Sequence, residues 1–425
     1  MIYNPARNFV SGVTFIVFLI LDYVDAILCV LYKFVDEYIE GREAIPCHCK
    51  KREEKKDGGE EECELSETLF GRKNVFREMG FLGFGRKLKG FHKRDGGKEV
   101  NRWSDCGCET CVSWMSDGER KLHVFVREPA SQEATTGKPA ENVIFIHGFL
   151  SSSSYWTEKV FPNLSEPVKR NYRLFAIDLL GFGGSPKPRD CLYTMEDHLE
   201  MIEKSVIHPY QLNSFHVVAH SMGCIVGMAL AAKHLNSVKS ITLVASPYFP
   251  SEDGGALRVL NIIAAKRLWP PSAFGTSVMS WYEHIGRCVC LLICRNHRTW
   301  ERILRLLTGK SDLHFLIMDL TKHTHHSAWH SMHNVICGGV KSMEGYLEAV
   351  TGAGVKICVL QGERDLVVPV ECSYNIKQKA PNAEVDIIKI ANHRTVIISR
   401  EKQFTSYLER IWASLADSTT CTEEY

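Results

Sequence analysis

The stretch Val217-Val218-Ala219-His220-Ser221-Met222-Gly223-Cys224 decides the fold of this chain. The apolar residues 215–219 predict a buried strand, and the helix-forming residues 225–234 predict a helix. Ser221 lies between them, with the small residues Ala219 and Gly223 two positions away on each side. This is the G-x-S-x-G pattern of a nucleophile elbow with alanine in the first glycine position, a sharp turn that exposes a serine hydroxyl.

A reactive serine needs a general base, a carboxylate that orients the base, and donors for the developing oxyanion. Residues 355–360 predict a strand, and Asp365 lies in the loop after it. Residues 383–390 predict another strand, and His393 lies in the loop that follows. The order serine, aspartate, histidine, each after a strand, is that of one large hydrolase fold. We therefore expect Ser221 as nucleophile, His393 as base and Asp365 as the orienting carboxylate.

The oxyanion donors are expected from two places in the backbone. Residues 142–146 predict a strand that ends in a His-Gly-Phe triplet, and the N–H of Phe149 is the first candidate. The N–H of Met222, directly after the serine, is the second, because it begins the predicted helix. The residues that we expect beside the pocket, in shaping rather than reacting roles, are His147, Gly148 and His220.

Each of these residues also has a purely structural interpretation. Asp365 could be a solvated loop carboxylate, and Glu363 is a nearby competitor for its role. His393 is one of 18 histidines, and its place after the last strand singles it out. Asp178 ends another predicted strand and is expected to fix loops near the site rather than to react.

The composition is that of an ordinary globular protein, with 425 residues of which 45% are hydrophobic. The formal net charge of +1 implies no global electrostatic partner, and we expect no nucleic-acid binding. Alternating strands and helices predict an α/β fold with a mostly parallel sheet, beginning with strands at 112–115 and 121–127. The expected units are an N-terminal segment at 1–46, a charged, cysteine-containing extension at 47–110, a core at 111–246 and 348–425, and a helical lid at 247–347.

The predicted lid breaks the strand–helix rhythm and is expected to exclude water from an apolar pocket. Its residues 285–310 carry six basic side chains against one acidic side chain, Glu301. A basic lid suits an amphiphile with an anionic head group, and a solvated basic face explains the same residues equally well. His326, His330 and His333 share one helix face, but no cysteine or carboxylate completes a metal site there, so we expect no metal and no cofactor. The basic residues are Arg287, Arg295, Arg298, Arg302, Arg305 and Lys310.

The N-terminal segment is long and apolar enough to enter a membrane. Residues 9–21 contain no charge, Asp22 and Asp25 then interrupt, and residues 9–31 have the length of a bilayer span. Each aspartate would cost about 2.5–3.5 kcal/mol at the bilayer centre. The segment is therefore either a signal or anchor segment or a helix lying in the interface, and we favour an uncleaved anchor because no A-x-A site follows. A hydrophobic helix docked on the domain is the alternative.

The extension mixes charge runs with cysteines. Residues 48–68 predict a solvated linker, and the basic, aromatic residues 75–93 suit either an anionic membrane surface or packing on the domain. The cysteine spacing C-x-C-x-x-C lacks a matching second pair for zinc, so we favour disulfides in an oxidising compartment. Acylation of Cys29, Cys47 or Cys49 is a further alternative. The basic residues after the N-terminal segment favour a cytosolic catalytic part, whereas disulfides favour an oxidising compartment. The two indications disagree, so the orientation in the membrane stays open. The cysteines before the core are Cys47, Cys49, Cys63, Cys106, Cys108 and Cys111.

The chain resembles the α/β-hydrolase superfamily and, more narrowly, the plant BODYGUARD family of lysophospholipases linked to cuticle formation. The resemblance rests on the segment with Asp22 and Asp25, the cluster at 106–111, and residues 143–156, 178–188 and 216–224. It implies a Ser–Asp–His hydrolase of lipid-like esters at the cell surface, membrane-associated or in the wall. The family pattern falls on Ser221, Asp365 and His393. The departures are Ala219 for glycine and Asn392 where many hydrolases have glycine.

These observations predict hydrolysis of an amphiphilic lipid ester through an acyl-enzyme at Ser221. An acyltransferase that builds lipid polyester would use the same residues, and so would a hydrolase of carbon–carbon bonds. A non-catalytic scaffold of the same fold is the alternative from another class. Epoxide hydrolysis is disfavoured, because on this fold it needs a carboxylate at position 221. The partners that we expect are the lipid ester and a membrane that the N-terminal segment contacts.

Overall fold

The computed structural model describes most of the core and lid and parts of the N-terminal region. The described residues are 5–40, 48, 65–70, 74–79, 102–114, 121–130, 140–250 and 255–420, with the backbone alone at 5–9 and 416–420. The predicted charged linker lies largely outside them, as do Cys47, Cys49 and Cys63 and most of the basic, aromatic residues at 75–93.

The centre of the fold is one seven-stranded sheet in the order β1-β3-β2-β4-β5-β6-β7. All neighbouring strands are parallel except the edge strand β1, which is antiparallel to β3. The middle strand β4 is buried along its whole length, as expected for a parallel sheet covered on both faces. The predicted α/β-hydrolase fold with a mostly parallel sheet is confirmed. The strands are β1 (Val124–Arg127), β2 (Glu141–Ile146), β3 (Tyr172–Ile177), β4 (Phe215–His220), β5 (Val238–Val244), β6 (Lys356–Gly362) and β7 (Glu384–Ile388).

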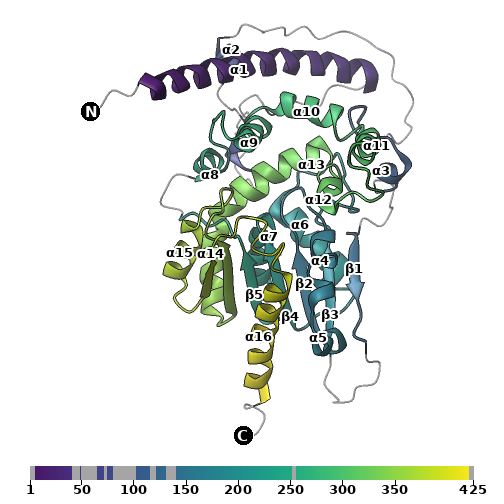
Figure 1. Cartoon of the computed structure of the whole chain (residues 1–425), viewed down its shortest axis with the longest axis vertical. Helices are drawn as coiled ribbons and strands as arrows, with labels where there is room; N and C mark the ends of the chain where they lie inside the picture. Colours follow the sequence, from purple (N-terminus) through teal and green to yellow (C-terminus); the bar gives the residue numbers. More distant parts are fainter. Residues whose placement is uncertain are drawn as a thin grey trace, which may run out of the picture.

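Helices cover the two faces of this sheet (Figure 1), and a separate hydrophobic core lies on each face. On one face lie α6 (Met195–Ile202), α7 (Met222–Lys233) and α14 (Gly339–Gly352). On the other lie α4 (Ser154–Thr157), α5 (Glu166–Asn171) and the C-terminal α16 (Glu401–Thr420). Since side chains alternate between the faces of a strand, each core draws on every second strand residue. The short α15 (Glu371–Lys379) lies between β6 and β7.

A layer of helices stands between this sheet and the long N-terminal helix (Figure 1). It forms the inserted helical lid that the sequence predicts. Its last helix runs through a π-helical turn, Ser331–Gly338, into α14, which crosses the predicted boundary at 347 and packs on the sheet side. The lid helices are α8 (Gly255–Ile263), α9 (Pro271–Trp281), α10 (Glu283–Leu292), α11 (His297–Thr308), α12 (Phe315–Asp319) and α13 (His325–His330).

The predicted strand at 112–115 is wrong. The chain forms the short helix α3 (Glu109–Ser113) there, and the N–H of Val112 donates to the carbonyl of Cys108 at 2.9 Å. The β-branched Val112 and the aromatic Trp114 suggest a strand, but the edge of the sheet at β3 is already occupied by β1. A strand without a partner leaves its backbone polar groups unpaired, so the local helix is favoured.

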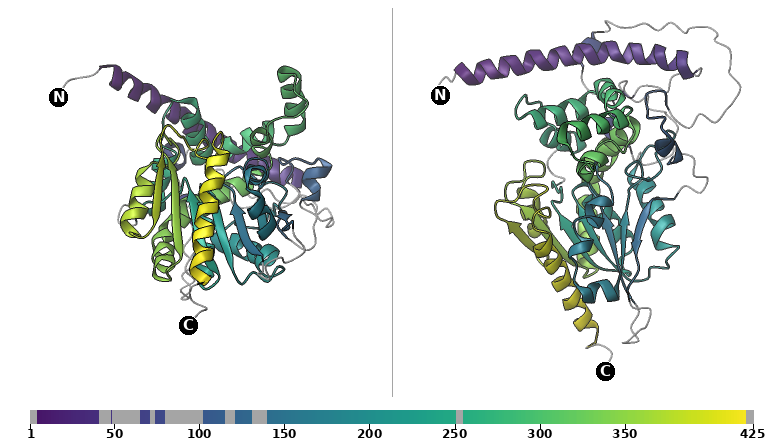
Figure 2. Two further views of the ribbon diagram at one scale, coloured as in Figure 1. Left: turned by 60° about the horizontal axis from the view of Figure 1, so that its bottom comes forward. Right: turned by 45° about the vertical axis from the view of Figure 1, so that its right-hand side comes forward.

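The N-terminal helix α1 (Pro5–Glu40) lies across the lid, with the short α2 (Val75–Glu78) beside it (Figure 2). Its aspartates face inward. Asp25 is buried and pairs with Arg77, and Asp36 receives two hydrogen bonds of 2.7 Å from Arg287 on α10. The exposed apolar side chains form the opposite stripe of the helix, so α1 is amphipathic as it is docked. That stripe consists of Ile16, Ile20, Tyr23, Val24, Leu31, Phe34 and Tyr38.

Residues 102–105, at the end of the predicted extension at 47–110, join α1 to the lid. The indole N–H of Trp103 donates to Asp36 at 2.6 Å, and the buried hydroxyl of Ser104 accepts from Arg287. The Arg287 guanidinium also lies over the Tyr32 ring at 4.3 Å. Arg287 is thus engaged within the protein, which excludes it from the basic surface that the lid sequence suggests.

Candidate active site

Ser221 lies on a strained turn between β4 and α7. Its φ of 54° is in the left-handed region that few residues with a side chain adopt, and its N–H donates to the carbonyl of Val244 at 2.9 Å. A Cβ on Gly223 would stand 2.5 Å from the carbonyl oxygen of His147 and 2.6 Å from that of Ile146. The glycine of the motif is therefore required because the start of α7 passes directly against the end of β2.

The structure brings together the three residues that the sequence predicts as a triad. His393 Nε2 lies 3.0 Å from Ser221 Oγ, and His393 Nδ1 lies 2.8 Å from Asp365 Oδ2. The three side chains come from the loops after β4, β6 and β7, whose carboxyl ends meet at one edge of the sheet. This geometry permits a proton to pass from the hydroxyl to the imidazole. The catalytic roles of the three residues stay a prediction.

Asp365 is held as an ionised acceptor. The N–H groups of Val367 and Val368 donate to its Oδ1 at 2.8 and 2.9 Å, and Gln361 Nε2 donates to Oδ2 at 3.0 Å. Burial raises the pKa of Asp365, but the hydrogen bonds from His393 and the two amides outweigh burial and hold it below its ordinary value. The competitor Glu363 is exposed and accepts from the N–H of Ile390 instead. Asp365 is thus the carboxylate that faces the histidine.

The predicted oxyanion donors lie at the start of α7 and in the loop after β2. Met222 is the first residue of α7, where backbone N–H groups have no partner within the helix. Phe149 follows β2, and its ring meets that of Phe182 edge-on at 5.7 Å. A Cβ on Gly148 would stand 3.1 Å from Ser221 Cβ, so this loop packs directly against the serine. The oxyanion hole itself stays a prediction.

The two histidines beside the site are neutral and buried. The N–H of Leu179 donates to His147 Nε2 at 2.9 Å, so His147 Nδ1 carries the proton and donates to the Gly148 carbonyl at 2.7 Å. His220 Nε2 donates to the carbonyl of His393 at 3.0 Å, and its ring stacks on Tyr155. Burial lowers the pKa of His147 and lowers that of His220 to about 3. Both hold loops in place, and His393 alone faces the hydroxyl.

Asp178 ties together the loops around the site. It accepts from the backbone N–H groups of Ser153 and Gly184, and His123 Nδ1 lies 2.9 Å from its Oδ2. Burial raises the pKa of Asp178, but these hydrogen bonds outweigh burial and lower it well below the ordinary range. The carboxylate therefore stays ionised and joins the loops after β2 and β3.

The lid is attached to these same loops by contacts that the sequence does not indicate. Ser152 Oγ donates to Asp319 on α12 at 2.7 Å, and Ser327 Oγ donates to the Gly181 carbonyl at 2.9 Å. Phe315 on α12 also meets Tyr155 edge-on. No sequence motif links these residues, because their partners are far away in the sequence.

The rings of His326 and His330 lie 4.2 Å apart, and the lid histidines have separate hydrogen-bond partners. His326 Nε2 donates to the Cys191 carbonyl at 2.8 Å, and His333 Nδ1 lies 3.0 Å from the Thr68 hydroxyl.

Of the basic lid residues, Arg298, Arg302 and Arg305 line a cavity of about 370 Å³ between α11 and α3. Three exposed apolar residues, here called the apolar rim, lie in the two loops that carry Asp365 and His393. Leu366, which is 92% exposed, and Val367 directly follow Asp365, and Ile390 lies shortly before His393.

Comparison with known proteins places the chain among hydrolases. Residues 141–268 match the family described as the alpha/beta hydrolase fold. "Probable lysophospholipase BODYGUARD 4" of Arabidopsis thaliana is 55% identical over 95% of this chain and 97% of its own length. "Probable lysophospholipase BODYGUARD 5" of the same plant is 52% identical over 94% of each chain. "Probable lysophospholipase BODYGUARD 1" is 40% identical over 96% of this chain and 97% of its own.

The ionised state of Asp178 predicts a pH-dependent contribution to stability. Because its folded pKa is depressed, the contribution is present above the unfolded value of about 4 and is lost as pH falls below it. We expect Asp178→Asn to lower the free energy of unfolding by about 2–3 kcal/mol at pH 7. The difference should shrink as pH falls from 5 to 3, measured by denaturant unfolding. The exposed Asp312→Asn is the control, and a difference for Asp178→Asn that is constant with pH would contradict the assignment.

Proposed function

We propose that this chain, which belongs to the BODYGUARD family of α/β hydrolases, is a serine hydrolase of lipid-like carboxylic esters of the lysophospholipase type. The observation that carries the proposal is the continuous hydrogen-bonded relay from Ser221 through His393 to Asp365. Both ring nitrogens of His393 have a hydrogen-bond partner in the relay. The hydrogen bonds that Asp365 accepts keep its carboxylate ionised. A relay of this kind activates a serine for attack on an acyl carbonyl.

The reaction that we propose proceeds through an acyl-enzyme. Ser221 Oγ bonds to the acyl carbon while its proton passes to His393 Nε2, and Asp365 stabilises the imidazolium. The N–H groups of Met222 and Phe149 hold the oxyanion. The imidazolium then protonates the leaving alcohol, whose bond to the acyl carbon breaks. A water molecule, deprotonated by the same histidine, releases the fatty acid and restores the serine.

The surroundings of the relay favour an amphiphilic substrate. The exposed rim at Leu366, Val367 and Ile390 offers apolar surface for an acyl chain directly beside the triad. Relatives that span nearly the whole chain carry the name lysophospholipase, and a lysophospholipid combines one acyl chain with a charged head group. We extend the proposal to a role in cuticle or cutin formation at the cell surface, on the resemblance to the family alone.

The N-terminal helix supports a membrane location for this reaction. The helix Val10–Glu40 is long and apolar enough to cross a membrane, and an 18-residue window within it has a mean hydropathy of 2.4. Crossing would remove Asp25 and Asp36 from Arg77 and Arg287 and place them in lipid, which is costly. We therefore propose that α1 lies in the interface, with its exposed apolar stripe in the lipid and its acidic face on the lid.

The proposed nucleophile predicts the outcome of active-site labelling. We expect a fluorophosphonate probe to label the protein at Ser221 and Ser221→Ala to abolish the labelling, measured by mass spectrometry of the labelled peptide. Asp365→Asn should lower kcat about 10³–10⁴-fold, because the histidine loses its orienting partner. Glu363→Gln is the matched control in the same loop and should leave kcat unchanged. Labelling that persists in Ser221→Ala would sink the assignment.

If water is the acyl acceptor, the reaction releases free fatty acid, whereas an alcohol acceptor would give a new ester. We expect purified protein to release free fatty acid from a lysophospholipid faster than from a monoacylglycerol or a hydroxy-fatty-acyl ester, measured by mass spectrometry of the products. Oligomeric esters from the hydroxy-acyl donor would instead favour the acyltransferase with the same triad. Rescue of a loss-of-function plant by Ser221→Ala would favour the non-catalytic scaffold.

The interfacial placement of α1 predicts a topology. A tag before residue 5 and the catalytic core should lie on the same side of a vesicle membrane, measured by protease protection. Replacing Ile16, Ile20 and Val24 by serine should weaken flotation with vesicles, because these side chains form the exposed stripe. Leu257→Ser, at an exposed site on α8, is the control. A tag and core on opposite sides would establish a spanning helix.

A further inference from the structure

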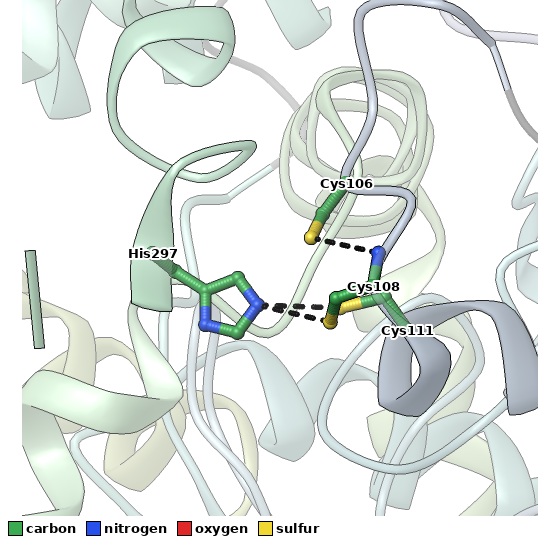
Figure 3. Close-up of side chains that lie close together, drawn as sticks. All are labelled: Cys106, Cys108, Cys111 and His297. Atoms are coloured by element: carbon green, nitrogen blue, oxygen red, sulfur yellow. Dashed lines mark hydrogen bonds between the residues drawn. The ribbon is translucent and has the colours of Figure 1, made fainter. Parts of the chain in front are cut away.

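Four metal-ligand side chains from two distant parts of the chain meet at one side of the lid (Figure 3). Cys106, Cys108 and Cys111 belong to the segment before β1, and His297 is the first residue of α11. Their donor atoms all lie within 4.8 Å of one another. None of the four takes part in the Ser221 relay, so this cluster needs an explanation of its own.

The spacing of the donors fits a tetrahedral ion. His297 Nε2 lies 3.5 Å from Cys108 Sγ and 3.5 Å from Cys111 Sγ. In a tetrahedron with Zn–S near 2.3 Å and Zn–N near 2.05 Å, the S–N edge is about 3.6 Å. The imidazole nitrogen and the two sulfurs are therefore already at the separation that a shared zinc ion would impose.

The cluster also has the surroundings that hold metal ligands in position. His297 Nδ1 lies 2.8 Å from Glu301 Oε1, one turn further along α11, so Nδ1 carries the proton and Nε2 presents its lone pair to the thiols. The backbone N–H of Cys108 points at Cys106 Sγ at 3.5 Å, so an amide dipole faces this sulfur. Carboxylate–histidine pairs of this kind fix both tautomer and ring orientation at metal sites.

We propose that Cys106, Cys108, Cys111 and His297 bind one zinc ion that clamps the segment before β1 to α11. Three thiolates and one imidazole favour zinc over hard cations, and four protein donors leave no open position, which is typical of a structural site. On binding, the three thiols release their protons to solvent and the imidazole remains neutral. The clamp would tie this segment to the lid in place of the disulfides that the cysteine spacing favours.

A second cluster in the described part of the chain is less complete. His323 Nε2 lies 3.7 Å from Cys290 Sγ and 3.6 Å from Cys294 Sγ. Three donors leave a closed tetrahedral site one ligand short, so the proposal concerns the four-ligand cluster alone. An ion at this second cluster would add equally to the zinc content of the unmodified protein and of each variant. The test therefore compares the zinc content of the variants with that of the unmodified protein.

The test is the zinc content of the full-length protein, purified in detergent without a histidine tag and measured by inductively coupled plasma mass spectrometry. We expect the double variant Cys108→Ser/Cys111→Ser to contain one zinc ion per chain less than the unmodified protein. His297→Cys should retain the ion, because a fourth thiolate replaces the imidazole. Cys191→Ser, at a half-buried thiol outside the cluster, is the control and should also retain it.

A second measurement keeps the proposal falsifiable even if the double variant folds poorly. Glu301→Gln should keep one ion but bind it about 10–100-fold more weakly in competition with a chromophoric chelator, because the histidine loses its orienting carboxylate. Equal zinc content in the unmodified protein and the double variant would overturn the proposal. So would a zinc-free native protein whose Cys106, Cys108 or Cys111 is found in a disulfide by mass spectrometry.

Discussion

The contact between Gly223 and the end of β2 is the constraint on which the site depends. Any side chain at position 223 would collide with the carbonyl oxygens of Ile146 and His147. Because that space is empty, α7 can begin directly against β2, and the turn before it can hold Ser221 at a φ of 54°. The same closeness brings the loop of Gly148 and Phe149 alongside the serine. Nucleophile and expected oxyanion donors are thus positioned by one backbone approach.

The parts of the site that the sequence predicts are those that strand ends determine. Parallel strands deliver their following loops to one edge, so a serine, an aspartate and a histidine that each follow a strand are brought together by topology alone. The need for a small residue at Gly223 could also be predicted, because it belongs to a turn that is defined by neighbouring residues in the sequence. The alternation of strands and helices in the sequence predicted the fold. The stretch at 112–115 is the exception, because it could form a strand only beside a free sheet edge, and β1 already occupies the edge at β3.

The parts that the sequence did not predict depend on partners that are far apart along the chain. Asp36 and Arg287 are separated by 251 residues and Ser152 and Asp319 by 167. Neither pair has a motif that links its members. The thiol cluster shows the same limit, because its spacing lacks a second pair and His297 completes it from 186 residues beyond Cys111. Local spacing therefore predicted chemistry within a loop, whereas ion pairs and metal ligands across the lid needed the tertiary structure.

The segment at 102–114 connects these observations, because it is attached to three elements in succession. Trp103 and Ser104 bond to the Asp36–Arg287 pair between α1 and α10, and the cysteines that follow face His297 on α11. With zinc bound, the lid would be held to α1 at one end and to this segment at the other, while Asp319 and Ser327 hold it to the loops of the site. A lid fixed at so many points is expected to admit substrate along its edges rather than by swinging open as a whole. Leu366 and Ile390 remain exposed in the loops that carry Asp365 and His393, so the apolar surface nearest these two residues in the sequence is not covered by the lid.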